Sequence, residues 1–223
     1  DRDAYEPGVP CWVDTLGPDT QAARDFYAGI FGWEYEEGPG EYFVARLRGR
    51  DVAGIGAQPD APAAASWNTY VSVASVDDSA ADVRDAGGAV LVEPFDVAPA
   101  GRMAVVADPA GAAFNLWESG ARHGAQVVNE HGAWSMSVLA TPDPDGAAAF
   151  YGAVFGWTTE AFGPFTMLRL PGYVGGEPQQ PVSREVIAVM RPTEEGEQPA
   201  WSADFWVPDV DGAAASAGRL GGS

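Results

Sequence analysis

Phe26-Tyr27-Ala28-Gly29-Ile30-Phe31-Gly32-Trp33 recurs almost letter for letter as Phe150-Tyr151-Gly152-Ala153-Val154-Phe155-Gly156-Trp157. In the first copy, apolar residues recur with the spacing of one helix face, and Gly32 predicts the end of that helix. Repetition of this kind is typical of a duplicated architecture, in which each copy is one structural unit. The sequence therefore predicts that the two halves of the chain share a fold.

A second pair of segments supports the duplication. Trp67-Asn68-Thr69-Tyr70 opens a predicted strand, which is followed by a helix of small residues and by Gly87-Gly88. Trp201-Ser202-Ala203-Asp204 opens the same pattern, which ends at Gly221-Gly222. Each half therefore contains two modules of one kind, and the order of strand and helix signals predicts β-α-β-β-β for each module.

The two halves define a predicted domain organisation. The first domain is expected over residues 8–118, with modules at 9–56 and 67–118. Residues 119–131 are polar, contain glycine and lack periodicity, which indicates a linker. The second domain is expected over 132–223, and because its last module stops after a helix, we expect the final strands of that module to be absent from this sequence. The predicted fold class is α+β.

Composition excludes several classes of protein. The chain has 223 residues, a formal net charge of −20, 46% hydrophobic residues and eight tryptophans, which indicates a globular protein. Such a negative charge repels nucleic-acid phosphates, so no nucleic-acid partner is expected. No apolar run is long enough to span a bilayer and no leader is visible at Asp1, so we expect no membrane partner. Cys11 is the only cysteine, and we expect a reducing, cytoplasmic location.

Several motifs resemble those of the vicinal oxygen chelate superfamily, which includes glyoxalases, extradiol dioxygenases and bleomycin-resistance proteins. They are the helix entry Leu16-Gly17-Pro18-Asp19 with Phe31-Gly32-Trp33, its copy between Thr141 and Trp157, and the hairpin Asp108-Pro109-Ala110-Gly111 before Leu116-Trp117-Glu118. The resemblance covers nearly the whole chain and is closest to two-domain, actinobacterial-type members. It implies two glyoxalase-like domains, each with a curved, half-barrel sheet.

The resemblance also implies where a metal would bind. Family members that perform chemistry mostly hold a divalent metal through His or Gln on the first strand of a module and Glu on the last strand. In this chain the first-strand positions hold Trp12, Asn68, Met136 and Ser202, and a last-strand position holds Asn115. Both histidines lie in the predicted linker. We therefore expect no metal and no cofactor, because imidazole, thiolate and clustered carboxylate ligands are missing.

Strand alternation predicts the lining of the inner faces instead. The mixture of aromatic, apolar and a few polar side chains is typical of a small-molecule site. The acid, base or charged-contact candidates are Asp14, Tyr70 and Asp204, because a carboxylate on an inward face requires a partner. The predicted ligand contacts are Trp12, Asn68, Met103, Asn115, Trp117, Trp134, Met136, Ser202 and Trp206.

Two functions remain open from the sequence. The first is a metal-free binding protein of the bleomycin-resistance kind, which holds a hydrophobic or cationic natural product in an aromatic cleft. The second is an enzyme of the same fold, acting either by metal-free acid–base isomerisation or cyclisation or as a metal-dependent lyase or dioxygenase. The expected partner is a small molecule, and the chain is expected to be an internally duplicated monomer or a homodimer.

Overall fold

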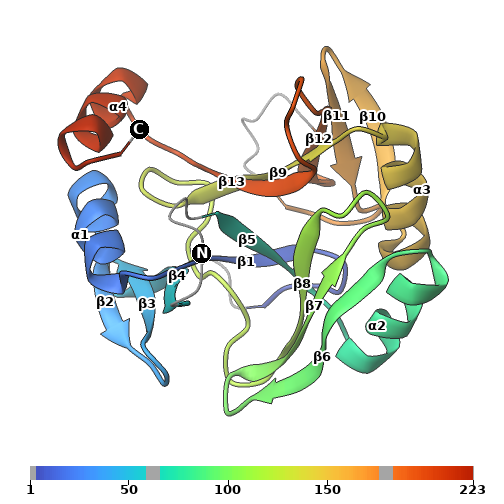
Figure 1. Ribbon diagram of the computed structural model, residues 1–223, viewed down its shortest axis with the longest axis horizontal. Helices are drawn as coiled ribbons and strands as arrows, with labels where there is room; N and C mark the ends of the chain where they lie inside the picture. Colours follow the sequence, from blue (N-terminus) through green and yellow to red (C-terminus); the bar gives the residue numbers. More distant parts are fainter. Residues whose placement is uncertain (1–3, 59–65, 176–182, 223) are drawn as a thin grey trace.

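The computed structural model describes residues 4–58, 66–175 and 183–222, and these form two mixed sheets with four helices between and beside them (Figure 1). The elements of the first half are β1 (Pro10–Gly17), α1 (Thr20–Phe31), β2 (Glu34–Glu37), β3 (Tyr42–Leu47), β4 (Arg50–Ala57), β5 (Trp67–Ser72), α2 (Val76–Asp85), β6 (Ala89–Val97), β7 (Gly101–Ala107) and β8 (Ala113–Ser119). Those of the second half are β9 (Trp134–Thr141), α3 (Pro144–Phe155), β10 (Thr158–Phe162), β11 (Phe165–Arg169), β12 (Val186–Pro192), β13 (Ala200–Phe205) and α4 (Val210–Arg219). None of the described helices has the length and apolar character needed to cross a membrane.

The strand order of both sheets reflects the modules. The first sheet has the order β2-β3-β4-β1-β5-β8-β7-β6, and the second has β10-β11-β12-β9-β13. In each complete module the first strand lies parallel to the last, as β1 with β4, β5 with β8, and β9 with β12. The modules of one sheet join through antiparallel first strands, β1 with β5 and β9 with β13. The α+β fold of tandem modules is therefore confirmed.

The first helix illustrates how local sequence positions these elements. The Asp19 side chain accepts a hydrogen bond from the backbone N–H of Ala22, which satisfies one free donor at the start of α1. Gly32 ends the helix with a left-handed φ of 72°, a conformation that glycine adopts without steric cost. The equivalent helix α3 repeats both features with Asp143 and Gly156. The predicted helix ends are therefore confirmed.

The two halves pack through the outer faces of their sheets. The hydroxyls of Thr69 on β5 and Ser137 on β9 lie 2.7 Å apart, and both residues are buried. In Figure 1, α1 lies beside α4 and α2 lies beside α3, so the helices also pair across the halves. Gly29 permits the first of these pairings, because a Cβ there would lie only 2.6 Å from Leu220. The core of the protein is therefore shared between the halves.

Successive residues of β1 and β5 alternate between the face that packs against the other half and the inner face of the first sheet. Val13 and Val71 are fully buried in the shared core. Their neighbours on the same strands, including Trp12 and Asp14, turn to the inner face of the first sheet because successive side chains on a strand point to opposite sides. The fold thus separates the face that packs between the halves from the opposite, inner face of the sheet. We retain residues 119–131 as the proposed linker between the halves.

Candidate small-molecule site

Asp14 is the centre of a polar cluster on the inner face of the first sheet. Its side chain is 1% exposed, and its Oδ1 accepts a hydrogen bond from Asn68 Nδ2 at 2.8 Å. Its Oδ2 accepts hydrogen bonds from the hydroxyls of Tyr70 at 2.7 Å and Tyr42 at 3.1 Å. The structure therefore brings together the predicted residues Asp14, Asn68 and Tyr70, and it adds Tyr42. We call these four residues the Asp14 cluster.

Strand register explains why these side chains meet. Asp14 lies opposite Asn68 of β5 on one side and opposite Gly54 of β4 on the other. A Cβ at Gly54 would overlap with the hydroxyl of Tyr42 and would lie 2.9 Å from the Cβ of Asp14. Glycine at position 54 therefore opens the space through which Tyr42 reaches the carboxylate from β3. Trp12 completes the arrangement, since its Nε1 donates to the Tyr42 hydroxyl at 2.9 Å.

The electrostatics of the cluster follow from its burial. Removal from water raises the pKa of Asp14, although the hydrogen bonds from Tyr70, Asn68 and Tyr42 act in the opposite direction. Burial, together with the neighbouring Asp14 charge, raises the pKa values of the Tyr42 and Tyr70 phenols well above their ordinary value. Both phenols therefore keep their protons and act as donors. Within the described ranges, all three donors to Asp14 are neutral groups.

Other predicted contacts extend this face along the sheet. Asn115 of β8 lies in register with Tyr70, and Met103 of β7 lies in register with Trp117. The rings of Tyr70 and Trp117 pack edge to face with centroids 6.3 Å apart. Met103 and Trp117 are partly exposed, whereas Asn115 is buried. The first sheet thus combines a polar centre with an apolar and aromatic wall.

The remaining predicted residues belong to the second sheet. Met136 and Trp134 lie on β9, Ser202 and Asp204 lie on β13, and Trp206 follows that strand. Asp204 and Ser202 are exposed, and Trp206 is 41% exposed beside the ring of His131. Trp134 is 5% exposed and packs in the core with Trp33 of the first half. The structure therefore divides the predicted set between two sheets instead of gathering it in one cleft, because the outer faces of the sheets pack together.

The described residues do not fit the metal that the family uses. Across the described ranges there is no group of three or more His, Cys, Asp or Glu side chains that could hold a metal ion. The Asn68 amide is engaged with Asp14, and Glu118 accepts a hydrogen bond from the backbone N–H of Val76 at the start of α2. The carboxylate nearest the last-strand position therefore caps a helix. The expectation of a metal-free protein stays a prediction.

Tyr42 is the site residue that the sequence did not reveal. It lies on β3, which is separated from β1 by β4, so no spacing along the chain connects it with Asp14. A signal was present in Gly54 and Gly56, which alternate along β4 and leave its inner face without side chains. Glycine inside a strand often marks the close approach of another group. Here that group is the Tyr42 ring.

Comparison with known proteins identifies the family. A model of the Glyoxalase/Bleomycin resistance protein/Dioxygenase superfamily matches residues 12–116. The chain is also 37% identical to "Putative glyoxylase CFP32" of Mycobacterium tuberculosis, over 99% of this chain and 85% of that protein. The chain belongs to this superfamily. The chain is likewise 33% identical to "Anthracycline biosynthesis protein DnrV" of Streptomyces peucetius, over 98% of this chain and 84% of that protein.

Solved structures share the fold at low sequence identity. The Mn(II)-bound glyoxalase from Novosphingobium aromaticivorans superposes with a TM-score of 0.65 and 17% identity, covering 96% of this chain and 70% of that one. The 2,2',3-trihydroxybiphenyl 1,2-dioxygenase from Sphingomonas wittichii gives a TM-score of 0.59 and 16% identity, covering 98% and 80%. These likenesses establish the two-domain architecture of the superfamily for this chain.

Proposed function

We propose that the protein binds a small, largely apolar organic molecule on the inner face of the first sheet, without a metal. The polar or cationic end of that molecule meets the Asp14 cluster. The observation that carries the proposal is the Asp14 carboxylate, which is 1% exposed and held by neutral donors alone. A carboxylate in such surroundings is costly unless a further partner stabilises its charge.

The position of the carboxylate favours recognition over folding. Burial raises the pKa of Asp14, which means that the folded protein destabilises its ionised form. A ligand that brings an ammonium group, or a hydroxyl that donates a hydrogen bond, compensates this cost when it binds. Trp12, Met103 and Trp117 supply the apolar and aromatic surface that the rest of such a ligand requires.

The relatives suggest a first probe. One is named for anthracycline biosynthesis, and anthracyclines as a chemical class combine a planar fused-ring ketone with, in many members, a cationic amino sugar. Such a molecule matches both parts of the proposed site, since the ring system stacks on tryptophan and the ammonium group pairs with a carboxylate. We infer that the ligand belongs to this general chemical class of aromatic natural products.

A second function rests on the hydrogen-bond chain of the cluster. The Trp12 indole donates to the Tyr42 hydroxyl, and that hydroxyl donates to Asp14. Because burial raises its pKa, Asp14 is closer to the basicity that a general acid or base requires near neutral pH. Metal-independent isomerisation or cyclisation of the bound molecule is therefore the alternative. It would appear as chemical change of the bound compound, which chromatography of the recovered ligand detects.

The binding proposal is tested by titrating the protein with an amino-sugar anthracycline and with its neutral aglycone, following tryptophan fluorescence. We expect Asp14→Asn to weaken binding of the cationic compound by at least tenfold, which corresponds to about 1.4 kcal/mol. Loss of one member of a desolvated charge pair costs about 2 to 5 kcal/mol, so the effect can be larger. Binding of the neutral aglycone is expected to change less.

Asp204→Asn is the matched control. It removes the same charge from an exposed position on the second sheet, so the affinity is expected to change by less than about twofold. Equal affinities of both variants and the unmodified protein would show that the carboxylate has no role. If Trp12→Ala also left the affinity unchanged, the site itself would be misplaced.

A further inference from the structure

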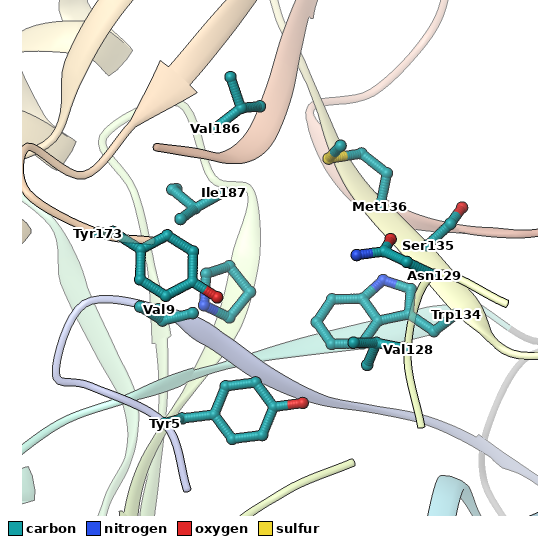
Figure 2. Close-up of a pocket in the computed structure, with 11 residues that line it drawn as sticks. Tyr5, Val9, Val128, Asn129, Trp134, Ser135, Met136, Tyr173, Val186 and Ile187 are labelled. Atoms are coloured by element: carbon teal, nitrogen blue, oxygen red, sulfur yellow. The ribbon is translucent and has the colours of Figure 1, made fainter. Parts of the chain in front are cut away.

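A second cavity lies outside the Asp14 cluster, at the beginning of the second sheet. It is formed by Tyr5 and the start of β1, by residues 128 and 129, and by β9, Tyr173 and the start of β12. Figure 2 shows these side chains arranged around the opening, with Trp134 and Asn129 on one wall and Tyr173 with Ile187 on another. None of the four residues of the Asp14 cluster lines it. An inference about this cavity therefore stands independently of the proposed function.

One polar group in this cavity has no partner in the described structure. Trp134 is 5% exposed, and its indole Nε1 is buried without a hydrogen-bond acceptor among the described residues. In Figure 2 the indole nitrogen lies on the edge of the ring nearest the Asn129 side chain, and the six-membered ring points toward Tyr173 and Ile187. The other buried tryptophans Trp33, Trp157 and Trp201 all donate their indole N–H to an oxygen. An unsatisfied buried donor is costly and calls for an acceptor.

The chain holds this donor in place firmly. The backbone N–H of Asn129 donates to the carbonyl of Trp134 at 3.0 Å, and Asn129 has a left-handed φ of 58°. Asn adopts that conformation more readily than most residues, although it is uncommon for any residue other than glycine. The geometry thus presents the Asn129 amide beside the Trp134 indole, so a bound molecule meets two polar groups on the same wall.

The remaining lining defines the chemistry of the ligand. None of the residues that line the cavity is charged. Besides Trp134 and Asn129, the lining has three residues with a hydroxyl group, Tyr5, Ser135 and Tyr173. The other lining residues are apolar: Val9, Pro10, Val128, Met136, Val186 and Ile187. Its volume is about 50 Å³, which is room for roughly four water molecules. A cavity without a charged lining residue favours a neutral molecule over an ion, and its size suits a molecule of a few heavy atoms or one end of a longer molecule.

We propose that this cavity is a second binding site, which takes a small neutral carbonyl compound whose oxygen accepts the hydrogen bond of the Trp134 indole. The apolar body of the compound packs against Met136 and Ile187. A ketone oxygen accepts this hydrogen bond without bringing a donor of its own, whereas an alcohol also brings a hydroxyl proton that needs a partner. A hydrocarbon of the same shape fills the space but leaves the donor unpaired.

The test uses cyclopentanone as the probe and cyclopentane as its matched hydrocarbon. The ¹⁵N–¹H NMR spectrum of the chain contains one indole signal for each tryptophan, and the signal lost in Trp134→Phe assigns the residue. We expect cyclopentanone to move the Trp134 indole proton downfield in a saturable manner, and to bind about tenfold more tightly than cyclopentane because the donor gains a partner. The Trp117 indole donates to the carbonyl of Arg122 and serves as the internal control. We expect no change in the chemical shift of its indole proton.

A blocking variant completes the test. Ile187→Phe fills the cavity, so it is expected to abolish the shift of Trp134 while the indole signals of Trp33 and Trp157 confirm that the protein is folded. If Trp134→Phe does not fold, Met136→Ala assigns the signal by its displacement. Equal binding of ketone and hydrocarbon, absence of a saturable shift, or a long-lived water on the indole that the ketone does not displace would each overturn the proposal.

Discussion

The two copies agree closely in one region and differ in another. They agree where the two halves of the chain pack together, which we call the seam. There the Trp33 indole donates to the carbonyl of Gly132, and the Trp157 indole donates to the carbonyl of Gly8. Each half thus reaches into the beginning of the other through the same contact. The agreement follows from packing, because two copies that bury one face against each other must keep complementary shapes.

The inner faces differ at the positions of β1 and β5 that form the Asp14 cluster. Asp14 of the first sheet corresponds to Val138 of the second, where the facing residue on the neighbouring strand is Ser202 instead of Asn68. Tyr70 corresponds in the same way to Asp204. Among the described residues the polar cluster therefore exists in the first copy alone, although both copies have the same fold. The copies therefore agree where they bury a face against each other and differ where no such packing constrains them.

The largest expected effect concerns the seam. The Tyr151 hydroxyl donates to Asp108 of the other half at 3.1 Å and accepts from the Trp201 indole at 2.9 Å, in a fully buried position. Tyr151→Phe leaves two buried polar groups unsatisfied, and we expect it to lower the free energy of unfolding by about 2 to 4 kcal/mol. Urea denaturation measures this loss.

Tyr27→Phe is the matched control for that variant. The Tyr27 hydroxyl accepts from the Trp67 indole at 3.1 Å, but both side chains are partly exposed, so water can replace the lost group. We expect a loss below about 1.5 kcal/mol. Equal losses for the two variants would mean that the link through Asp108 between the halves contributes nothing beyond the shared tyrosine–tryptophan pair.

An intermediate effect is expected when the second sheet is given the charge of the first. Val138→Asp introduces a carboxylate at the position equivalent to Asp14, where Ser202 replaces Asn68 and the acidic Asp204 replaces Tyr70, so the amide and phenol donors of these two positions are missing. We expect the free energy of unfolding at pH 7 to fall by about 1 to 3 kcal/mol, the usual cost of an unpaired polar group that is partly removed from water. Val138→Asn introduces a side chain of nearly the same shape as Asp but without the charge, so it separates the contribution of charge from that of shape and polarity. If Val138→Asn loses as much stability as Val138→Asp, the charge does not account for the cost.

The smallest effect concerns the pH dependence of stability. Burial raises the pKa of Asp14 from 3.8, so the folded state holds this proton more tightly than the unfolded chain. The stabilisation is fully present below about pH 4 and is lost as the pH rises through the folded-state pKa. Asp14→Asn lacks this titration. We therefore expect the free energy of unfolding of Asp14→Asn to increase relative to that of the unmodified protein as the pH rises from about 4. The difference between the two proteins changes by at most about 1.4 kcal/mol per pH unit.

Denaturation curves of both proteins across that range measure the difference. The raised pKa of Asp108 acts equally in both proteins and cancels in the comparison. If the unmodified protein instead gained stability over Asp14→Asn as the pH rises, the three hydrogen bonds to Asp14 would outweigh its desolvation, and the carboxylate would be a structural group.

Two strands show where sequence patterns lose their predictive value. β2, with the sequence Glu-Tyr-Glu-Glu, and β10 occupy places in the predicted module order but have no strand pattern of their own, since both are short edge strands with largely exposed side chains. An edge strand that buries neither face has no apolar alternation to detect. The strands that flank the seam were predicted well for the opposite reason, because burial of one face imposes the period of two.

The sequence by itself determined the duplication, the fold class, the helix ends at Gly32 and Gly156, and the face of β1 to which Asp14 turns, because these depend on the spacing of nearby residues. Tertiary structure alone decided that Tyr42 joins Asp14, that Asp204 stays apart from it on another sheet, and that the Trp134 indole is left beside a cavity. Each of these outcomes depends on which distant strands become neighbours and in what register, and hydrogen bonding and desolvation are set by those neighbours.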